Sequence, residues 1–166
     1  FAVSPITTHI DIKNVSKNLK SKIIINKIIT IHKFYKKVLK KIPRIGILGL
    51  NPHNAEMNTN SEEKRIIIPS VLKLKRKGIN LTGPLVTDTL FMEDFKKYDV
   101  IVGMYHDQVL TPFKTMFKFD AINITLGLKY LRVSPDHGVA KNLIGKNKAN
   151  PKSLIECINF INKFGK

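Results

Sequence analysis

The stretch from Gly103 to Gly138, GMYHDQVLTPFKTMFKFDAINITLGLKYLRVSPDHG, decides how the rest of the chain is interpreted. An apolar run that begins at Val100 ends abruptly in Tyr105-His106-Asp107-Gln108. A buried strand that delivers polar side chains to its carboxyl end is the usual geometry of a site in an open α/β sheet. The stretch therefore predicts a strand that ends at His106, with a functional site beside it.

Single polar residues continue between apolar or turn residues along this stretch, at Lys114, Asn123, Arg132 and His137. A surface segment has little reason to space single polar groups in this way. Lys114 and Arg132 are suited to a phosphate or carboxylate, and Asn123 could hydrogen-bond a substrate. Any one of these residues, or His106, could instead be a satisfied core group or a solvated charge, and the residues alone leave both interpretations open.

Two earlier strands are also expected to end in histidine. Thr7-Thr8-His9 follows a short strand that starts at Phe1, and His53 follows the apolar run RIGILGL that starts at Arg44. Three neutral imidazoles at strand ends could hold a divalent metal and leave positions open for substrate oxygens. Such an ion would act as a Lewis acid on a hydroxyl or carbonyl oxygen.

Two carboxylates accompany the histidines. Asp107 follows His106 directly, and Asp88 lies in the loop Thr87-Asp88-Thr89. Both are candidates for proton transfer or for orienting a histidine ligand.

Strands and helices alternate along the chain without a repeat or a linker, which predicts a single layered α/β region over residues 1–166. Periodic apolar residues predict a helix over 14–41 with Ser21 as an N-cap, and Pro69 should kink the helix that begins at Ser61. Asn150 is expected to cap the last helix, ahead of Pro151. The other predicted elements are strands at 81–84, 99–104, 121–126 and 131–133 and helices at 93–97, 108–118 and 138–144.

Composition narrows the class of protein. The chain has 166 residues, of which 43% are hydrophobic, so it can bury a core. No apolar run approaches the roughly 18 residues of a membrane-spanning helix. Cys157 is the single cysteine, which excludes an internal disulfide and a cysteine metal cluster. These features fit a protein of the reducing cytoplasm.

The net charge of +17 raises the possibility of nucleic-acid binding. The charge comes almost wholly from lysines mixed with isoleucine and asparagine throughout, with arginine only at positions 44, 65, 76 and 132. Dispersed lysines without interleaved aromatics and without a known RNA- or DNA-binding motif indicate a compositional bias. A basic nucleic-acid-binding module is therefore the weaker alternative.

Six motifs together resemble the family of 4-hydroxythreonine-4-phosphate dehydrogenase, an enzyme of pyridoxal phosphate biosynthesis. They run in the family's order across nearly the whole chain, which makes the resemblance specific. The motifs are Thr7-Thr8-His9, Gly49-Leu50-Asn51-Pro52-His53, Gly83-Pro84-Leu85 with Asp88-Thr89-Leu90-Phe91, Met104-Tyr105-His106-Asp107-Gln108, Asn123-Ile124-Thr125-Leu126-Gly127-Leu128 and Asp136-His137-Gly138.

The resemblance implies oxidation of 4-phosphooxy-L-threonine by NAD or NADP, followed by decarboxylation. It implies one divalent ion (zinc, magnesium, cobalt or manganese) on His9, His53 and His106. It implies substrate binding by Lys114, Asn123 and Arg132, with Lys114, Asp88 and Asp107 as catalytic candidates. The cofactor would be bound by Asp136, His137, Gly138 and Asn150, although His137 could instead cap a helix.

The resemblance also implies the fold of the isocitrate and isopropylmalate dehydrogenases and a homodimer whose metal site is shared between subunits. On this basis we expect the chain to be the C-terminal part of a longer dehydrogenase, with the N-terminal half absent. A degenerate member that folds and binds metal without turnover is the second alternative. Two departures from the family bear on it: the loop after His53 lacks the family's glycines, and Val109 replaces a glycine, which is expected to strain the turn beside His106.

Overall fold

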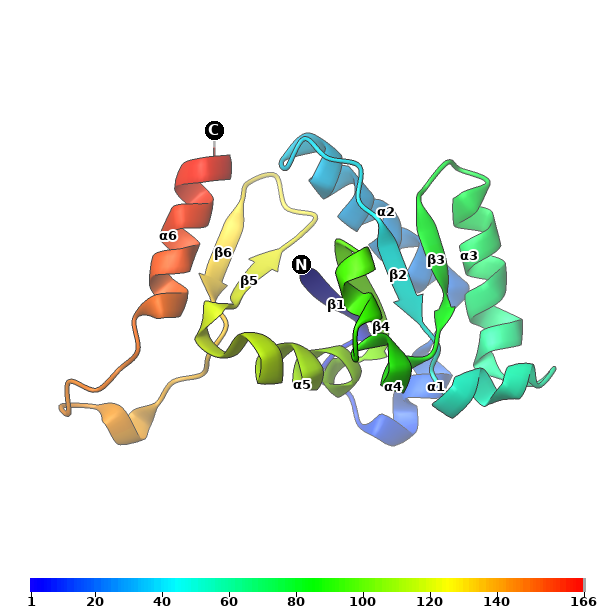
Figure 1. Ribbon diagram of the computed structural model, residues 1–166, viewed down its shortest axis with the longest axis horizontal. Coiled ribbons are helices and arrows are strands. Elements are labelled where there is room, and N and C mark those ends of the chain that lie inside the picture. Colours follow the sequence, from blue (N-terminus) through cyan, green and yellow to red (C-terminus); the bar gives the residue numbers. More distant parts are fainter. Residues whose placement is uncertain (166) are drawn as a thin grey trace. The chain divides into compact units, whose positions relative to one another are not determined.

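The computed structural model describes residues 1–165. The chain divides into two compact units, Phe1–Pro112 and Phe113–Lys166, called here the first and the second unit. The first unit contains a four-stranded sheet in the order β1-β4-β2-β3, in which every neighbouring pair is parallel (Figure 1). Its strands are β1 (Ala2–Thr7), β4 (Val100–Tyr105), β2 (Ile45–Leu48) and β3 (Leu81–Leu85).

The two faces of this sheet are covered by different helices. The helices of the first unit are α1 (Val15–Asn18), α2 (Ser21–Lys37), α3 (Ile68–Lys75), α4 (Thr87–Leu90) and the first residues of α5 (His106–Phe117). α2 and α3 pack against each other, α2 also against β1 and α3 against β3. Leu48 and Ile101 of the sheet form a separate hydrophobic cluster with Leu90 of α4 and Val109 of α5. The parallel sheet with flanking helices confirms the predicted α/β class.

Apolar periodicity explains why these helices form. Ile24, Ile28 and Ile31 recur at helical spacing on α2, and all three are buried. Strands β2 and β4 are buried along nearly their whole length, as parallel strands covered on both faces must be. The remaining short turns of the first unit are η1 (Ile12–Asn14), η2 (Pro52–Met57), η3 (Glu63–Ile67) and η4 (Asp94–Lys97).

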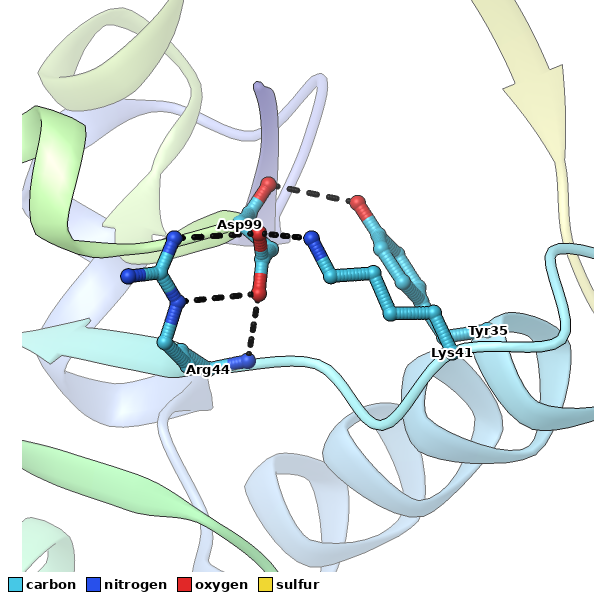
Figure 2. A network of polar contacts seen from close by, with 4 residues as sticks. All are labelled: Tyr35, Lys41, Arg44 and Asp99. Carbon is cyan, nitrogen blue, oxygen red and sulfur yellow. Dashed lines mark hydrogen bonds and ion pairs between the residues drawn. The ribbon is translucent and has the colours of Figure 1, made fainter.

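A buried carboxylate fastens the start of β4 to the segment before β2. Asp99 binds the side chain of Lys41 at 2.7 Å, and its Oδ2 accepts the backbone N–H of Arg44 at 2.8 Å and the guanidinium at 3.3 Å (Figure 2). The hydroxyl of Tyr35 donates to the Asp99 carbonyl at 3.2 Å. Burial would raise the pKa of Asp99, but the bonds from Arg44 and Lys41 outweigh it and hold that pKa well below its ordinary value. Burial and Asp99 together raise the pKa of Tyr35 to about 12.

The second unit contains an antiparallel pair, β5 (Ile122–Thr125) and β6 (Arg132–Pro135), with α6 (Lys152–Phe164) packed against it. Ser153 and Cys157 are the buried residues of α6. The end of α5 and the short turns η5 (Lys118–Asp120) and η6 (Lys141–Leu143) complete this unit.

Two predicted details are wrong. The region 138–144 forms only the short turn η6, and Val139 and Ile144 are 85% and 75% exposed, so no buried face supports a helix there. Ser21 is the first residue of α2, where its hydroxyl accepts a hydrogen bond from Ser70 and makes no cap bond. Pro69 lies in the first turn of α3, directly after the π-helical turn η3, and the helical backbone runs on from η3 into α3. An irregular helical turn beside the proline fits the interruption expected there, because proline lacks the N–H of a regular helix. Within residues 1–165 no helix is long and apolar enough to cross a membrane.

Candidate functional site

The His-Asp pair lies where the sequence predicted it, at the carboxyl end of β4. Tyr105 is the last residue of the strand and His106 the first of α5, so the imidazole projects from a strand-to-helix turn. Its Nδ1 lies 2.6 Å from Oδ1 of Asp107. A carboxylate on one ring nitrogen fixes the tautomer and leaves the other nitrogen, Nε2, available to a ligand.

His9 lies beside His106 at the end of the neighbouring strand, β1. The two ring centres are 5.8 Å apart. Thr7, which is buried, donates its hydroxyl to the carbonyl of Met104 at 2.8 Å and so fastens the end of β1 to β4. The two histidines line a pocket of about 330 Å³, whose wall is formed by Thr7, His9, Ile10, Ile12, Val15, Tyr105, His106 and Asp107.

His53 begins a left-handed turn after β2. Five consecutive non-glycine residues, His53 through Met57, have φ between 47° and 59°. This conformation is unfavourable for residues that carry a Cβ, so the glycines that the sequence lacks here would relieve strain. His53 is exposed, and its Nε2 lies 3.8 Å from Oδ2 of Asp88, which is exposed as well.

Glu63 holds the chain just ahead of this turn. Its carboxylate is fully buried and accepts the backbone N–H groups of Leu50 and Asn51 at 2.7 and 2.8 Å. The Asn51 side chain donates to its second oxygen at 3.0 Å. Burial alone would raise the pKa of Glu63, but the bonds from Asn51 and Leu50 outweigh it, so the pKa lies below its ordinary value.

The residues fit a divalent metal only in part. Two imidazoles whose nitrogens lie about 2.1 Å from one ion have ring centres within roughly 6 Å of each other, which the pair of His9 and His106 satisfies. However, among residues 1–165 no three histidine, cysteine, aspartate or glutamate side chains come together closely enough to hold an ion. One chain therefore brings together two of the three predicted ligands, and His53 faces Asp88 instead.

In the second unit, Lys114 and Asp136 come together. The Lys114 ammonium donates to the Asp136 carbonyl at 3.1 Å and lies 3.4 Å from its carboxylate. Ser153, which is 1% exposed, donates to the carbonyl of Ala121 at 2.6 Å and accepts the N–H of Asp136 at 3.0 Å. This hydroxyl fixes the segment after β6, on which Asp136 lies, to the start of β5.

Asn123 and Arg132 project from the paired strands β5 and β6 and are both exposed. The guanidinium of Arg132 donates to the hydroxyl of Thr125 at 3.5 Å, a long hydrogen bond that leaves most of its donors directed to solvent. The exposed guanidinium is therefore accessible to a negatively charged ligand.

Three of the four residues predicted to bind the cofactor are consecutive, from Asp136 to Gly138, and Asn150 follows later in the chain. His137 and Gly138 are exposed and lie outside any helix, so His137 does not cap one. Asn150 accepts the backbone N–H of Lys152, the first residue of α6, at 3.0 Å, but the N-cap position itself is occupied by Pro151, one residue later than predicted. The Asn150 side chain therefore has a structural role at the start of α6 that does not depend on a cofactor.

Sequence reasoning missed the buried polar residues that support the site. Glu63 shares a helical face with Ile67, Ser70, Val71 and Leu74, so its spacing signalled burial. Gln108 and Ser153 gave no such signal, because each contacts residues far away along the chain. The strain expected at Val109 is wrong, because the residue lies in α5 and its fully buried side chain packs on Leu48 and Ile101.

The chain is similar to a set of dehydrogenases. The family model described as pyridoxal phosphate biosynthetic protein PdxA matches residues 1–161. The 4-hydroxythreonine-4-phosphate dehydrogenase of Sulfurihydrogenibium sp. is 44% identical over 158 residues, which cover 94% of this chain and 49% of that protein. The one from Aquifex aeolicus is 42% identical over 157 residues, again 94% of this chain and 49% of that protein.

Solved structures agree with these sequences. The crystal structure of a 4-hydroxythreonine-4-phosphate dehydrogenase from Klebsiella pneumoniae superimposes with a TM-score of 0.84 and 35% identity, over 99% of this chain and 50% of that one. The chain thus spans about half the length of the relatives that it matches. Since the family model covers nearly every residue, this chain belongs to the PdxA family of pyridoxal phosphate biosynthetic proteins.

Proposed function

We propose that this chain forms the metal- and substrate-binding part of a 4-hydroxythreonine-4-phosphate dehydrogenase. The whole enzyme would oxidise the secondary alcohol of 4-phosphooxy-L-threonine with NAD or NADP. Loss of carbon dioxide from the resulting β-keto acid would then give 3-amino-2-oxopropyl phosphate. Family membership and the names of the relatives support this reaction, and the order of the motifs supports a C-terminal position within a longer protein.

The observation that carries the proposal is the arrangement of His9, His106 and Asp107 at adjacent strand ends. The Asp107 carboxylate contacts Nδ1 of His106 and holds the ring in one orientation, which leaves Nε2 to coordinate a metal ion. His9 and His106 would hold the divalent ion, which when bound supplies Lewis acidity to the substrate hydroxyl. The pocket beside them is also lined by Val15, which is buried and would present an apolar surface to the substrate.

His53 would complete the ligand set from a second subunit, in a homodimer. His53 is exposed, and residues 1–165 of one chain form no cluster of three metal ligands. Both observations are consistent with this arrangement. Asp88, 3.8 Å from Nε2 of His53, would turn the ring or carry a proton. The fold of the isocitrate and isopropylmalate dehydrogenases, which the resemblance implies, belongs to the same proposal.

The second unit would hold the charged ends of the substrate and the cofactor. Arg132 and Lys114 carry donors suited to phosphate or carboxylate oxygens, and Asn123 would orient a polar group. The Lys114 ammonium is 3.4 Å from the Asp136 carboxylate, so binding an anion would require it to exchange one partner for another. The segment Asp136-His137-Gly138 with Asn150 would bind the nicotinamide dinucleotide.

Metal titration of the chain tests this proposal. Wild type should bind about one divalent ion per subunit, and His9→Ala and His106→Ala should each lose it. His32→Gln is the matched control, because His32 lies in α2 and removing its imidazole should leave metal binding unchanged. Oligomeric state is recorded in the same samples, since the shared site predicts a dimer.

Reduction of NAD or NADP in the presence of 4-phosphooxy-L-threonine, measured on the full-length gene product, is the second measurement. Turnover that disappears in His106→Ala supports the enzyme. Metal binding without turnover would instead support the degenerate member of the family. A wild-type chain that binds no divalent ion contradicts the proposed site.

A further inference from the structure

Gln108 lies at a point where several strand ends meet. It is the third residue of α5 and is 8% exposed. Its side-chain oxygen accepts the backbone N–H of Met104 on β4 at 2.6 Å. Its side-chain nitrogen donates to the carbonyl of Gly49, just after β2, at 2.7 Å and to the hydroxyl of Thr87 at 3.0 Å.

These three bonds use both donors and one acceptor position of the amide. The oxygen must face the Met104 N–H and the nitrogen must face the Gly49 carbonyl, so only one orientation of the amide is possible. An apolar side chain at position 108 would remove the bonds to the Met104 N–H and the Gly49 carbonyl, which are both buried. The amide is therefore locked among three backbone segments.

Each of these segments leads directly to a candidate site residue. Met104 lies two residues before His106, Gly49 lies four residues before His53, and Thr87 immediately precedes Asp88. A second bond extends the network to β1, because Thr7 donates to the carbonyl of the same Met104 at 2.8 Å. Thr7 lies two residues before His9.

The absence of a side chain at Gly103 leaves room for the Gln108 side chain. A Cβ on Gly103 would lie 2.9 Å from the Gln108 side-chain oxygen and 2.5 Å from Val109, so the glycine allows α5 to approach β4. Glu63 holds the same His53 segment from the other side, through Leu50 and Asn51. The backbone that leads to His53 is thus fixed at two points.

We propose that Gln108 is a positioning residue that sets the loops of His9, His53, Asp88 and His106 in register with one another. This inference rests on the proposed function for its purpose, since the loops matter together only if they serve one site. Gln108 would not contact the reacting groups. It would act through its hydrogen bonds to the backbone segments that carry the site residues.

The test compares three variants with wild type. Gln108→Met keeps the length of the side chain and removes all three bonds. Gln108→Glu keeps the acceptor for Met104 and loses both donors. Thr87→Val removes one acceptor from a half-buried position and should preserve the fold if Gln108→Met does not. Ser70→Ala is the matched control, because Ser70 is also buried and joins α2 to α3 by a hydrogen bond to Ser21.

Imidazole signals in nuclear magnetic resonance spectra, recorded without metal at one pH, report the histidine positions. Gln108→Met should shift the signals of His9, His53 and His106 and leave that of His32 in place. Gln108→Glu should shift His53 most, because the bond to Gly49 is lost while the bond to Met104 remains. Thr87→Val should shift His53 through its neighbour Asp88. Ser70→Ala should lower thermal stability without moving the three signals.

Metal affinity is the second readout, with an expected loss of roughly tenfold to a hundredfold in Gln108→Met, as for other residues that orient metal ligands. If wild type binds no metal, the proposed function fails, and the spectra still decide the role of Gln108. Unmoved signals of His53 and His106 in Gln108→Met or Gln108→Glu overturn the inference. Equal shifts in Ser70→Ala also overturn it, because any loss of stability would then produce them.

Discussion

The two units hold their candidate residues in different ways. In the first unit, the histidine loops are fixed by buried polar side chains, with Glu63 fully buried and Gln108 8% exposed. In the second unit, Asn123 and Arg132 project from a two-stranded pair and are exposed, and the bond from Arg132 to Thr125 measures 3.5 Å. Buried hydrogen bonds therefore fix the loops of the first unit, whereas Arg132 in the second unit is exposed and makes one long hydrogen bond.

This difference separates stability from binding. A substitution that leaves a buried polar group without its partners lowers the free energy of unfolding. A substitution of an exposed side chain without strong contacts changes that free energy little. Substitutions that support the first unit should therefore lower stability and disturb the site together. Substitutions of the exposed residues in the second unit should affect ligand binding alone.

Glu63→Ala should have the largest effect. It leaves the N–H groups of Leu50 and Asn51 without their acceptor in a buried place and should lower the free energy of unfolding by about 3 kcal/mol. Urea denaturation measures the change. Glu93→Ala, at an exposed carboxylate, is the control and should stay within about 0.5 kcal/mol of wild type. A loss in Glu63→Ala no greater than in the control would show that the carboxylate does not hold this segment.

Asp99→Asn should have the next largest effect, about 2 kcal/mol at neutral pH, because it weakens the bonds from Lys41 and Arg44. The pKa of Asp99 is depressed in the folded state, so its contribution is complete above the unfolded value of about 3.8 and shrinks as the pH falls below it. The difference in stability between wild type and variant should therefore narrow in acid.

Thermal unfolding from pH 7 to pH 3 measures this narrowing. Asp94→Asn is the matched control, since Asp94 forms an exposed ion pair with Lys97. Asp94→Asn should change thermal stability little, because solvent screens an exposed ion pair. A constant difference for Asp99→Asn across the whole pH range would mean that the carboxylate is not the group that titrates.

The contrast between the units also explains what the sequence could predict. Apolar runs that end in His53 or His106 announce buried strands and place polar groups at their carboxyl ends, and the structure confirms both strands. The left-handed turn after His53 was invisible, because Ala55 and Glu56 give no local sign of a positive φ. Gln108 was invisible as a support, since its partners Gly49 and Thr87 are distant in sequence. The helix predicted over 138–144 is wrong because nothing buries its apolar residues.

Ala55→Gly should raise stability, by about 1 kcal/mol. Ala55 has φ of 49°, a conformation that glycine adopts without the steric cost of a Cβ. Ala140→Gly is the comparison in the second unit, where φ is −80° and the side chain is exposed, so glycine should lower stability slightly. Changes of opposite sign in urea denaturation would confirm that strain is concentrated in the His53 turn. The same sign at both positions would contradict it.

Arg132→Gln should have the smallest effect on stability, within about 0.5 kcal/mol, because the side chain is exposed and its bond to Thr125 is long. Its effect on binding should be larger, since the guanidinium is the group proposed to meet a phosphate. Titration with inorganic phosphate measures this, with Lys129→Gln as the control that removes an exposed charge three residues away. A general loss of positive charge would weaken phosphate binding equally in both variants. A loss confined to Arg132→Gln, without a change in thermal stability, would show that the second unit contributes binding groups and little to the fold.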